Sequence, residues 1–203
     1  NKALIAGDNV LLRKGTYKGV IAPVNSGTSE GKRIIYKNYP NEVPIIDHGK
    51  AITGWTKHLG TDGKDAIYKA KDSNAFKKIV EDDFLNAGRN TIYWDKAKPN
   101  TMVKDEINKI GASGEFYYQG GYLYARGSKS DNLNNHNMVG LISGNPAIDL
   151  NSKNYVTVDG ITIKYVLAFF EMRNSRYITI QNTTMQYSNR ANSASGSDHA
   201  VFR

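Results

Sequence analysis

Short apolar runs separated by glycine, proline and asparagine dominate the first fifty positions of the chain. Val10–Arg13, Gly19–Val24, Arg33–Tyr36 and Val43–Ile46 follow one another at intervals of roughly ten residues. No helical period of 3.6 residues links them, so each run predicts a short strand bounded by turns. Strands this short and this regularly spaced are typical of a β-sandwich or a β-solenoid.

An internal repeat distinguishes between these two folds. The segment Tyr155–Tyr165 aligns with Tyr177–Tyr187 at an offset of 22 residues, strand with strand and turn with turn. That offset is about one coil of a parallel β-helix. A single coil cannot bury its inward side chains, so the apolar residues of the two copies are expected to pack at matching heights. These residues are Val156, Val158, Ile161 and Ile163 in the first copy, and Ile178, Ile180 and Met185 in the second.

Gly160 and Asn182 fall at the corner of the repeat, where a tight bend favours residues that tolerate a positive φ. A last piece, His199–Arg203, overlays Phe169–Arg173 and predicts that Arg203 lies above Arg173. The sequence then stops within a coil. We therefore expect further polypeptide or a partner chain to cover the C-terminal apolar edge.

The middle of the chain has a different character. The run Phe116–Tyr124 contains Gln119-Gly120-Gly121 between two aromatic stretches and predicts a β-hairpin. The neighbouring Lys77–Leu85 is compatible with either a helical turn or a strand. We expect three segments: β-helix coils with an N-terminal cap over residues 1–53, a β-rich insertion over 54–140, and continuing coils over 141–203.

Composition supports an all-β protein with a sizeable core. The chain has 203 residues, of which 39% are hydrophobic, and it contains 13 tyrosines and 19 glycines. The absence of cysteine excludes disulfides and cysteine-based sites. No apolar run is long enough to predict a membrane span. No phosphate-binding glycine loop, serine elbow or nucleic-acid module is present, so nucleic acid is not an expected partner.

The formal net charge of +8 is unevenly distributed. Basic residues outnumber acidic ones by four in residues 1–50, by one in 51–150 and by three in 151–203. A basic surface on the flanks would concentrate a polyanion such as an acidic polysaccharide. The alternative interpretation is that this charge only keeps the protein soluble.

Several stretches resemble the pectate-lyase-like right-handed β-helix superfamily, which includes polysaccharide lyases of the chondroitinase B and alginate lyase type and related glycoside hydrolases. Ala3–Tyr17, with its Gly-Asp and Gly-Thr-Tyr, resembles the entry motif in which a capping helix leads into a first strand. Asn25–Tyr36 resembles the next coil, Gly114–Arg126 resembles the end of an insertion in β-helix glycosidase relatives, and Tyr155–Ile163 resembles the return to the main coil.

The resemblance implies a right-handed parallel β-helix with a short N-terminal capping helix. It also implies a secreted, periplasmic or cell-surface carbohydrate-active protein. Catalytic and calcium-binding residues of these families generally sit in later coils, so no catalytic residue carries over to this chain. Calcium is the one ion that the resemblance suggests, and the motifs indicate no other cofactor.

Charged residues near the end of the chain are candidates for polysaccharide chemistry. A lyase needs a base for the C5 proton and cations for the developing charge. Lys164, Arg173 and Arg203 are the candidate substrate-binding strip. The weak catalytic candidates, which are equally compatible with a solvated polar face, are Lys164, Glu171, Arg173, Asp198 and His199.

A glycosidase would instead need two carboxylates about 5–10 Å apart. Glu171 and Asp198 are the only acids after Asp159, and they fall on neighbouring predicted coils. Neither pattern decides between lyase and hydrolase. A non-catalytic surface, adhesion or tailspike-like module is the alternative to a polysaccharide-degrading enzyme, since β-helices also serve as rigid stalks.

No metal site is expected from the sequence. Glu81-Asp82-Asp83 indicates a solvated loop, because no second spaced set of oxygen ligands accompanies it. The four histidines are scattered without metal-ligand spacing. Aromatic residues in the insertion suit its core better than a sugar-stacking surface. These are Trp55, Trp94, Tyr117 and Tyr124.

Overall fold

A computed structural model gives the fold of the chain. The described residues are 3–59, 66–74, 76, 78–82, 91–95 (backbone only), 115–127, 132–141, 144–188 and 190–203. They form two compact units: residues 1–48 together with 144–203, and residues 49–143. The second unit extends a few residues beyond the predicted insertion, 54–140, at both ends.

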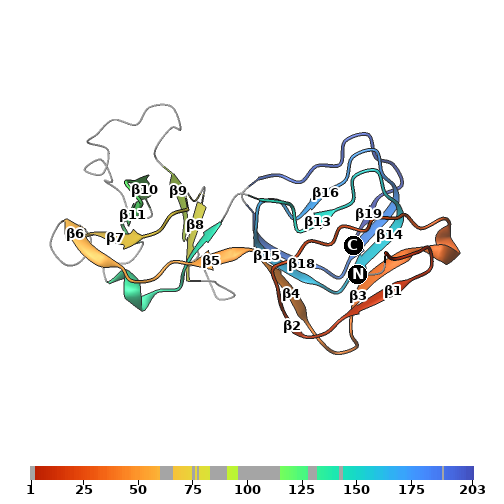
Figure 1. Cartoon of the computed structure of the whole chain (residues 1–203), viewed down its shortest axis with the longest axis horizontal. Helices are drawn as coiled ribbons and strands as arrows, with labels where there is room; N and C mark the ends of the chain where they lie inside the picture. Colours follow the sequence, from red (N-terminus) through yellow and green to blue (C-terminus); the bar gives the residue numbers. More distant parts are fainter. Residues whose placement is uncertain are drawn as a thin grey trace. The chain divides into compact units, whose positions relative to one another are not determined.

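The first unit is a parallel β-helix with three faces, which Figure 1 shows nearly end-on. The first face consists of β1 (Asn9–Leu12), β3 (Ile34–Asn38), β14 (Asn154–Asp159), β17 (Arg176–Gln181) and β19 (Val201–Phe202). The second face consists of β2 (Gly15–Tyr17), β4 (Pro44–Asp47), β15 (Thr162–Val166) and β18 (Thr184–Ser188). The third face consists of β13 (Ile148–Asp149) and β16 (Phe170–Glu171), extended by parallel bridges to Ile21 and Ser193.

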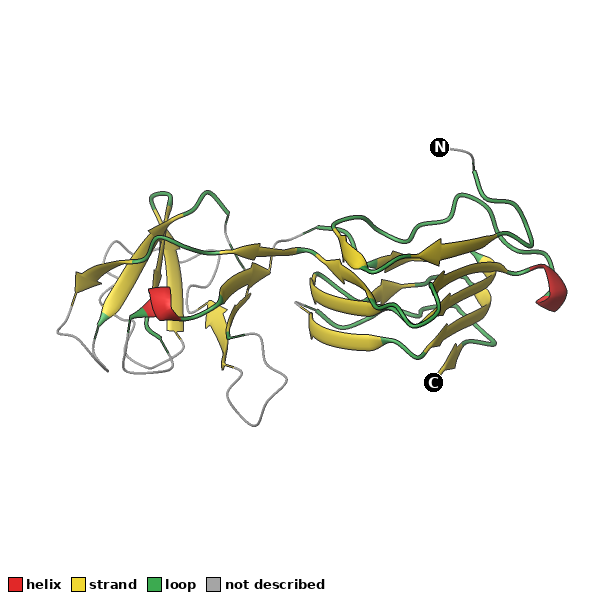
Figure 2. Cartoon of the chain, turned by 90° about the horizontal axis from the view of Figure 1, so that it is seen from below, coloured by secondary structure: helices red, strands yellow, loops and turns green. Residues whose placement is uncertain are grey.

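Every neighbouring pair of strands in this unit is parallel, and Figure 2 shows them stacked as successive layers. Val156 pairs with Ile178 and Ile163 with Met185, at the 22-residue offset of the sequence repeat. The inward apolar residues of both copies are buried in one core cluster, with Met185 packed against it. The predicted all-β solenoid is confirmed. Its side chains alternate between core and surface because successive residues of a strand point to opposite faces.

The corners of the coil carry the expected backbone geometry. Gly160 has a φ of 68° and Asn182 one of 51°, as the repeat predicted. At another corner the rings of Tyr155 and Tyr177 stack with centroids 4.5 Å apart, and His199 continues the stack on Tyr177 at 4.6 Å. Ring stacking between equivalent positions of this kind keeps successive coils in register.

The predicted N-terminal capping helix is wrong for the described residues 3–9. Gly7 turns the chain with a φ of 96°, and its amide donates to the carbonyl of Arg33 in the next coil. The Asp8 carboxylate accepts a hydrogen bond from the amide of Ile5. Ala3–Ala6 offers about one helical turn before this bend, and one turn does not offset the cost of helix nucleation. The segment before β1 is therefore irregular, with a turn at Ala6 and Gly7.

The second unit contains an eight-stranded sheet in the order β5-β12-β8-β9-β10-β11-β7-β6. The chain leaves the coil after β4 and returns to it before β13. All neighbouring strands of this sheet are antiparallel except β9 and β10. The strands are β5 (Gly49–Ala51), β6 (Thr56–Leu59), β7 (Ile67–Lys71), β8 (Lys78–Glu81), β9 (Thr91–Asp95), β10 (Glu115–Gln119), β11 (Tyr122–Ala125) and β12 (Met138–Leu141).

The predicted hairpin is present in this sheet. β10 and β11 pair antiparallel around Gly120 and Gly121, whose φ values of 59° and 81° suit a two-residue turn with both residues left-handed. The ambiguous stretch forms strand β8 where it is described. Trp55, Tyr117 and Tyr124 are buried, which confirms the core interpretation for them, while the side chain of Trp94 lies outside the described residues.

Two single-turn 3-10 helices, η1 (Glu30–Lys32) and η3 (Leu133–Asn135), complete the described elements. No helix among the described residues is long and apolar enough to cross a membrane. Val201 and Phe202 in β19 are 43% and 50% exposed. A covering segment or partner chain for this edge stays a prediction.

The buried carboxylate Asp72 in the second unit gives the fold a pH dependence. Burial opposes its ionisation, but hydrogen bonds from the amide and side chain of Asn74 and from Lys50 outweigh this effect and lower the pKa of Asp72. Because the pKa of Asp72 is lower in the folded state than in the unfolded chain, the ionised carboxylate stabilises the fold at neutral pH. This stability begins to be lost below the unfolded pKa of about 4 and disappears as the pH falls through the folded pKa. Asp72→Asn should therefore destabilise the unit at pH 7, and this effect should decrease progressively as the pH falls below about 4.

Urea denaturation followed by tryptophan fluorescence measures this change, because Trp55 and Trp94 both belong to residues 49–143. Asp198→Asn is the matched control, since Asp198 lies in the other unit and its side chain is 45% exposed. An equal destabilisation by Asp72→Asn at pH 7 and at pH 3 would contradict the assignment.

Candidate functional site

The third face of the β-helix carries two carboxylates in register on adjacent strands. Asp149 of β13 pairs with Glu171 of β16, and their neighbours Ile148 and Phe170 point into the core. Alternation along the strands therefore turns both carboxylates to the outside. Because paired strands lie about 4.8 Å apart, the backbones that carry the two carboxylates are about 5 Å apart.

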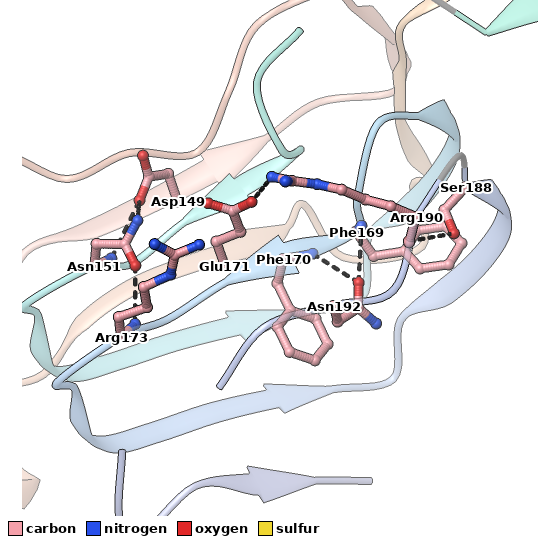
Figure 3. Close-up of polar contacts among 9 residues, drawn as sticks. All are labelled: Asp149, Asn151, Phe169, Phe170, Glu171, Arg173, Ser188, Arg190 and Asn192. Carbon is pink, nitrogen blue, oxygen red and sulfur yellow. Dashed lines mark hydrogen bonds and ion pairs between the residues drawn. The ribbon is translucent and has the colours of Figure 1, made fainter. Parts of the chain in front are cut away.

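Each carboxylate of this pair is held by neighbouring polar groups. Arg190 forms an ion pair with Glu171, whose side chain is only 12% exposed. Asp149 Oδ1 accepts hydrogen bonds from the amide of Asn151 at 3.2 Å and from its Nδ2 at 2.8 Å. Figure 3 shows Arg190 reaching Glu171 from one side, with Asn151 and Arg173 on the other. The positive charge of Arg190 offsets the repulsion between the two acids.

The loop that positions Arg190 is tied to the coil. The amide of Arg190 donates to the carbonyl of Leu167, and the Ser188 hydroxyl donates to the carbonyl of Arg190. Asn192 Oδ1 accepts from the amides of Phe169 and Phe170 at 3.0 and 3.2 Å. These bonds keep Arg190 beside β16. The third-face site is therefore Asp149, Asn151, Glu171, Arg173 and Arg190.

This arrangement is suited to acid–base chemistry on a glycosidic bond. Glycosidases place two carboxylates about 5–10 Å apart, and adjacent positions on paired strands bring Asp149 and Glu171 close enough for such a pair. A cation beside one of them favours its ionised form. The exposed Arg173 adds a positive group next to the pair, which suits a substrate that carries its own carboxylates.

The structure separates the three cations of the predicted basic strip. Lys164 lies in β15 on the second face, Arg173 follows β16 on the third, and Arg203 follows β19 on the first. Lys164 is paired in register with Asp47 and Gln186. A single strip of these three residues is therefore wrong.

The reason is the register of the last coil. Thr179 pairs with Val201, so the offset of 22 residues continues, whereas the overlay of Arg203 on Arg173 assumed an offset of 30. Arg203 lies instead at the level of Gln181, to whose Oε1 its Nε donates at 2.9 Å. The predicted two-rung basic ladder is absent.

Glu171 and Asp198 also occupy different positions. Glu171 bridges to Ser193, and Asp198 bridges to Arg176, with which it forms an ion pair of 3.2 Å. The two acids lie on neighbouring coils but out of register. His199 stacks on Tyr177 and its Nδ1 lies 3.3 Å from Asp198 Oδ1, so this pair belongs to the aromatic corner and not to the third-face site.

Sequence reasoning missed Asp149 and Arg190. The repeat contained the signal for the first of these, because Asp149 precedes Glu171 by one period of 22 residues. Arg190 follows Ala168 by one period, so the repeat has no charged residue at that position to reveal it, and only the tertiary contact brings it to Glu171. The calcium that the family resemblance suggested stays a prediction.

The three-faced stack of parallel strands defines the class of protein: the chain is a parallel β-helix protein. No family model matches the sequence, and no curated protein matches it. The fold is similar to that of XylC solved in complex with xylose, with a TM-score of 0.61 and 16% identity. The match covers 90% of this chain and 35% of the XylC chain, so this chain spans about a third of that protein.

A second solved structure, a glycoside hydrolase, overlaps 87% of this chain and 57% of its own length, with 9% identity and a TM-score of 0.43. At these identities the similarity to XylC shows the fold.

Proposed function

We propose that this chain is part of a carbohydrate-active β-helix enzyme whose third-face site binds an acidic polysaccharide. The observation that carries the proposal is the in-register pair Asp149 and Glu171 with Arg190 bound to one of its members. A fold shared with a xylose-bound protein supports a carbohydrate ligand. An extracellular, periplasmic or cell-surface location is part of the same proposal.

Acidic polymers are favoured over neutral ones by the exposed Arg173 and by the positive charge of the whole chain. Arg173 and Arg190 balance the two carboxylates of the site, and the chain as a whole carries a net charge of +8. A uronic acid could therefore place its carboxylate against Arg173 while its glycosidic bond lies beside Glu171. Attraction of this kind is screened over roughly 8 Å at physiological salt.

The alternative function, a non-catalytic surface or adhesion module, is favoured by the continuous aromatic stacks. Tyr165 and Tyr187 stack at 5.2 Å as Tyr155 and Tyr177 do at 4.5 Å, and a rigid stalk needs such corners. A stalk has no need for two outward carboxylates in register, however, and it therefore leaves the Asp149 and Glu171 pair unexplained.

Binding measurements test the proposal. Pectate, alginate and chondroitin sulfate are compared with neutral xylan and a neutral glucan at low and at physiological salt. We expect acidic polymers to bind more tightly, with affinity falling as salt rises. Arg173→Ala should weaken binding about 5- to 10-fold, which is the loss of one charge-assisted contact.

Arg203→Ala is the matched control, because Arg203 lies on the first face and should leave binding nearly unchanged. Release of reducing ends identifies cleavage, and an accompanying ultraviolet absorbance from an unsaturated product distinguishes a lyase from a hydrolase. Cleavage should be reduced at least 100-fold in Glu171→Gln. Equal binding of neutral and acidic polymers, unaffected by Arg173→Ala, would refute the acidic substrate, and binding without cleavage would favour the module.

A further inference from the structure

Three metal-ligating side chains converge at one end of strand β8 in the second unit. The Nδ1 atom of His136 lies 2.9 Å from Asp82 Oδ2 and 3.7 Å from Glu81 Oε1. The ligand atoms of all three residues lie within 4.8 Å of one another. In the sequence, Asp82 is 54 residues from His136, and Glu81 directly precedes Asp82. The antiparallel pairing of β8 with β12 brings the three residues together, because Glu81 is paired with Met138.

These side chains are largely removed from solvent, so the solvated loop predicted at Glu81-Asp82-Asp83 is wrong for Glu81, which is buried at the end of β8. The side chain of Glu81 is 1% exposed, that of His136 5% and that of Asp82 21%. Two carboxylates this close together repel each other, and the loss of hydration makes their charges costly. A divalent cation compensates two such carboxylates at once.

The backbone around the cluster orients one of its carboxylates. Asp82 has a φ of 55° and its amide donates to the carbonyl of Asn137. The amide of Asn137 donates in return to Asp82 Oδ1 at 3.1 Å. This contact holds one oxygen and turns the other, Oδ2, towards His136. Such an outer hydrogen bond is how proteins commonly orient a carboxylate ligand.

The distances and donor types select among cations. Ligands at about 2.0–2.1 Å in a tetrahedron stand about 3.3 Å from one another. The observed 2.9 and 3.7 Å lie on either side of that value. Calcium takes six to eight oxygens and magnesium prefers oxygen ligands, whereas an imidazole ligand suits zinc and other transition-metal ions, and zinc also accepts carboxylates.

We propose that Glu81, Asp82 and His136 form a binding site for Zn²⁺ or a similar transition-metal ion. The ion would take the place of the proton that His136 Nδ1 shares with Asp82, and water would complete the tetrahedron. Its effect would be to fasten the end of β8 to the segment that precedes β12. The site would therefore stabilise the second unit, separately from any chemistry on the β-helix.

Titration of the chelator-treated chain with Zn²⁺ tests the site. We expect about one equivalent to bind by calorimetry, and the thermal midpoint reported by tryptophan fluorescence to rise by about 5 °C or more at a hundredfold excess over Kd. Calcium and magnesium should produce no comparable rise. Co²⁺ should give the visible absorption of a tetrahedral complex, a readout that needs no variant.

Glu81→Gln and His136→Gln should each abolish the Zn²⁺ response. His58→Gln is the matched control, because His58 lies in the same unit but its ring contacts Tyr124 instead of the cluster. If either variant fails to fold, Asp82→Asn and the Co²⁺ spectrum of the unchanged chain decide. No Zn²⁺ response in the unchanged chain, or an undiminished one in both variants, would overturn the proposal.

Discussion

Replacing Ile163 with alanine should destabilise the β-helix by about 2–5 kcal/mol. The Ile163 side chain is fully buried, and it is paired in register with Ile46 in the coil before and Met185 in the coil after. A smaller side chain would leave a cavity between two coils that cannot close, because the parallel hydrogen bonds fix the spacing of the coils. Urea denaturation followed by far-ultraviolet circular dichroism measures the change.

Ile5→Ala removes the same atoms from a side chain that is 57% exposed, and it should change the free energy of unfolding by less than about 0.5 kcal/mol. Hydrogen exchange of peptides from β14 and β15 assigns the loss to the β-helix unit. A similar small effect for both variants would mean that the stacked core contributes much less than its burial indicates.

Gly27→Ala should destabilise the same unit by about 1–3 kcal/mol, which is typical of overpacking against atoms that cannot move away. A Cβ atom at position 27 would stand 2.4 Å from the carbonyl oxygen of Tyr155 and 2.6 Å from that of Lys32. Both are backbone atoms. The amide of Gly27 also donates to the carbonyl of Asn154 at 2.9 Å, so the loop cannot swing outward without losing that bond.

Gly31→Ala makes the same chemical change where nothing lies within 4 Å of the added atom. It should leave stability unchanged or raise it slightly, because alanine restricts the unfolded chain. Equal stability of the two variants in urea would show that the loop around Gly27 relaxes, and the close approach of the first loop to Tyr155 would then be unimportant.

The proposals for the two candidate sites can be tested independently. The third-face site concerns a sugar polymer and is read out by binding and cleavage. The Glu81, Asp82 and His136 cluster concerns an ion and is read out by stability of the insertion. Because the residues belong to separate compact units, failure of one proposal leaves the other intact.

The hydrophobic pattern predicted the parts of the fold that are local or periodic. The repeat of 22 residues gave the coil length, the inward residues Val156 to Ile163, and the corner residues Gly160 and Asn182. These succeed because inward and outward positions alternate along a strand and a solenoid repeats its environment. The sequence also predicted the hairpin at Gly120 and Gly121, since only a few residue types adopt the backbone conformation of its turn.

The predictions were wrong where they depended on aligning the last coil with the one before it, because a wrong offset changes every predicted neighbour. Overlaying His199–Arg203 on Phe169–Arg173 joined a first-face strand to a third-face strand, and the basic strip followed from that error. The aromatic stack offered the correct alignment, because Tyr155, Tyr177 and His199 recur at 22 residues. The capping helix was inferred only from a resemblance to a family motif, and it is wrong because the chain bends at Gly7, whose amide donates to the carbonyl of Arg33.

The sequence by itself therefore determined an all-β solenoid, its period and the sides of its strands, because burying apolar side chains in a repeating coil has few solutions. Only the tertiary structure decided which charged residues meet. Arg190 reaches Glu171 from a position where the previous coil has Ala168, and His136 reaches Asp82 across a strand pair formed within the insertion. Such contacts depend on register and loop path, and neither leaves a periodic trace in the order of the amino acids.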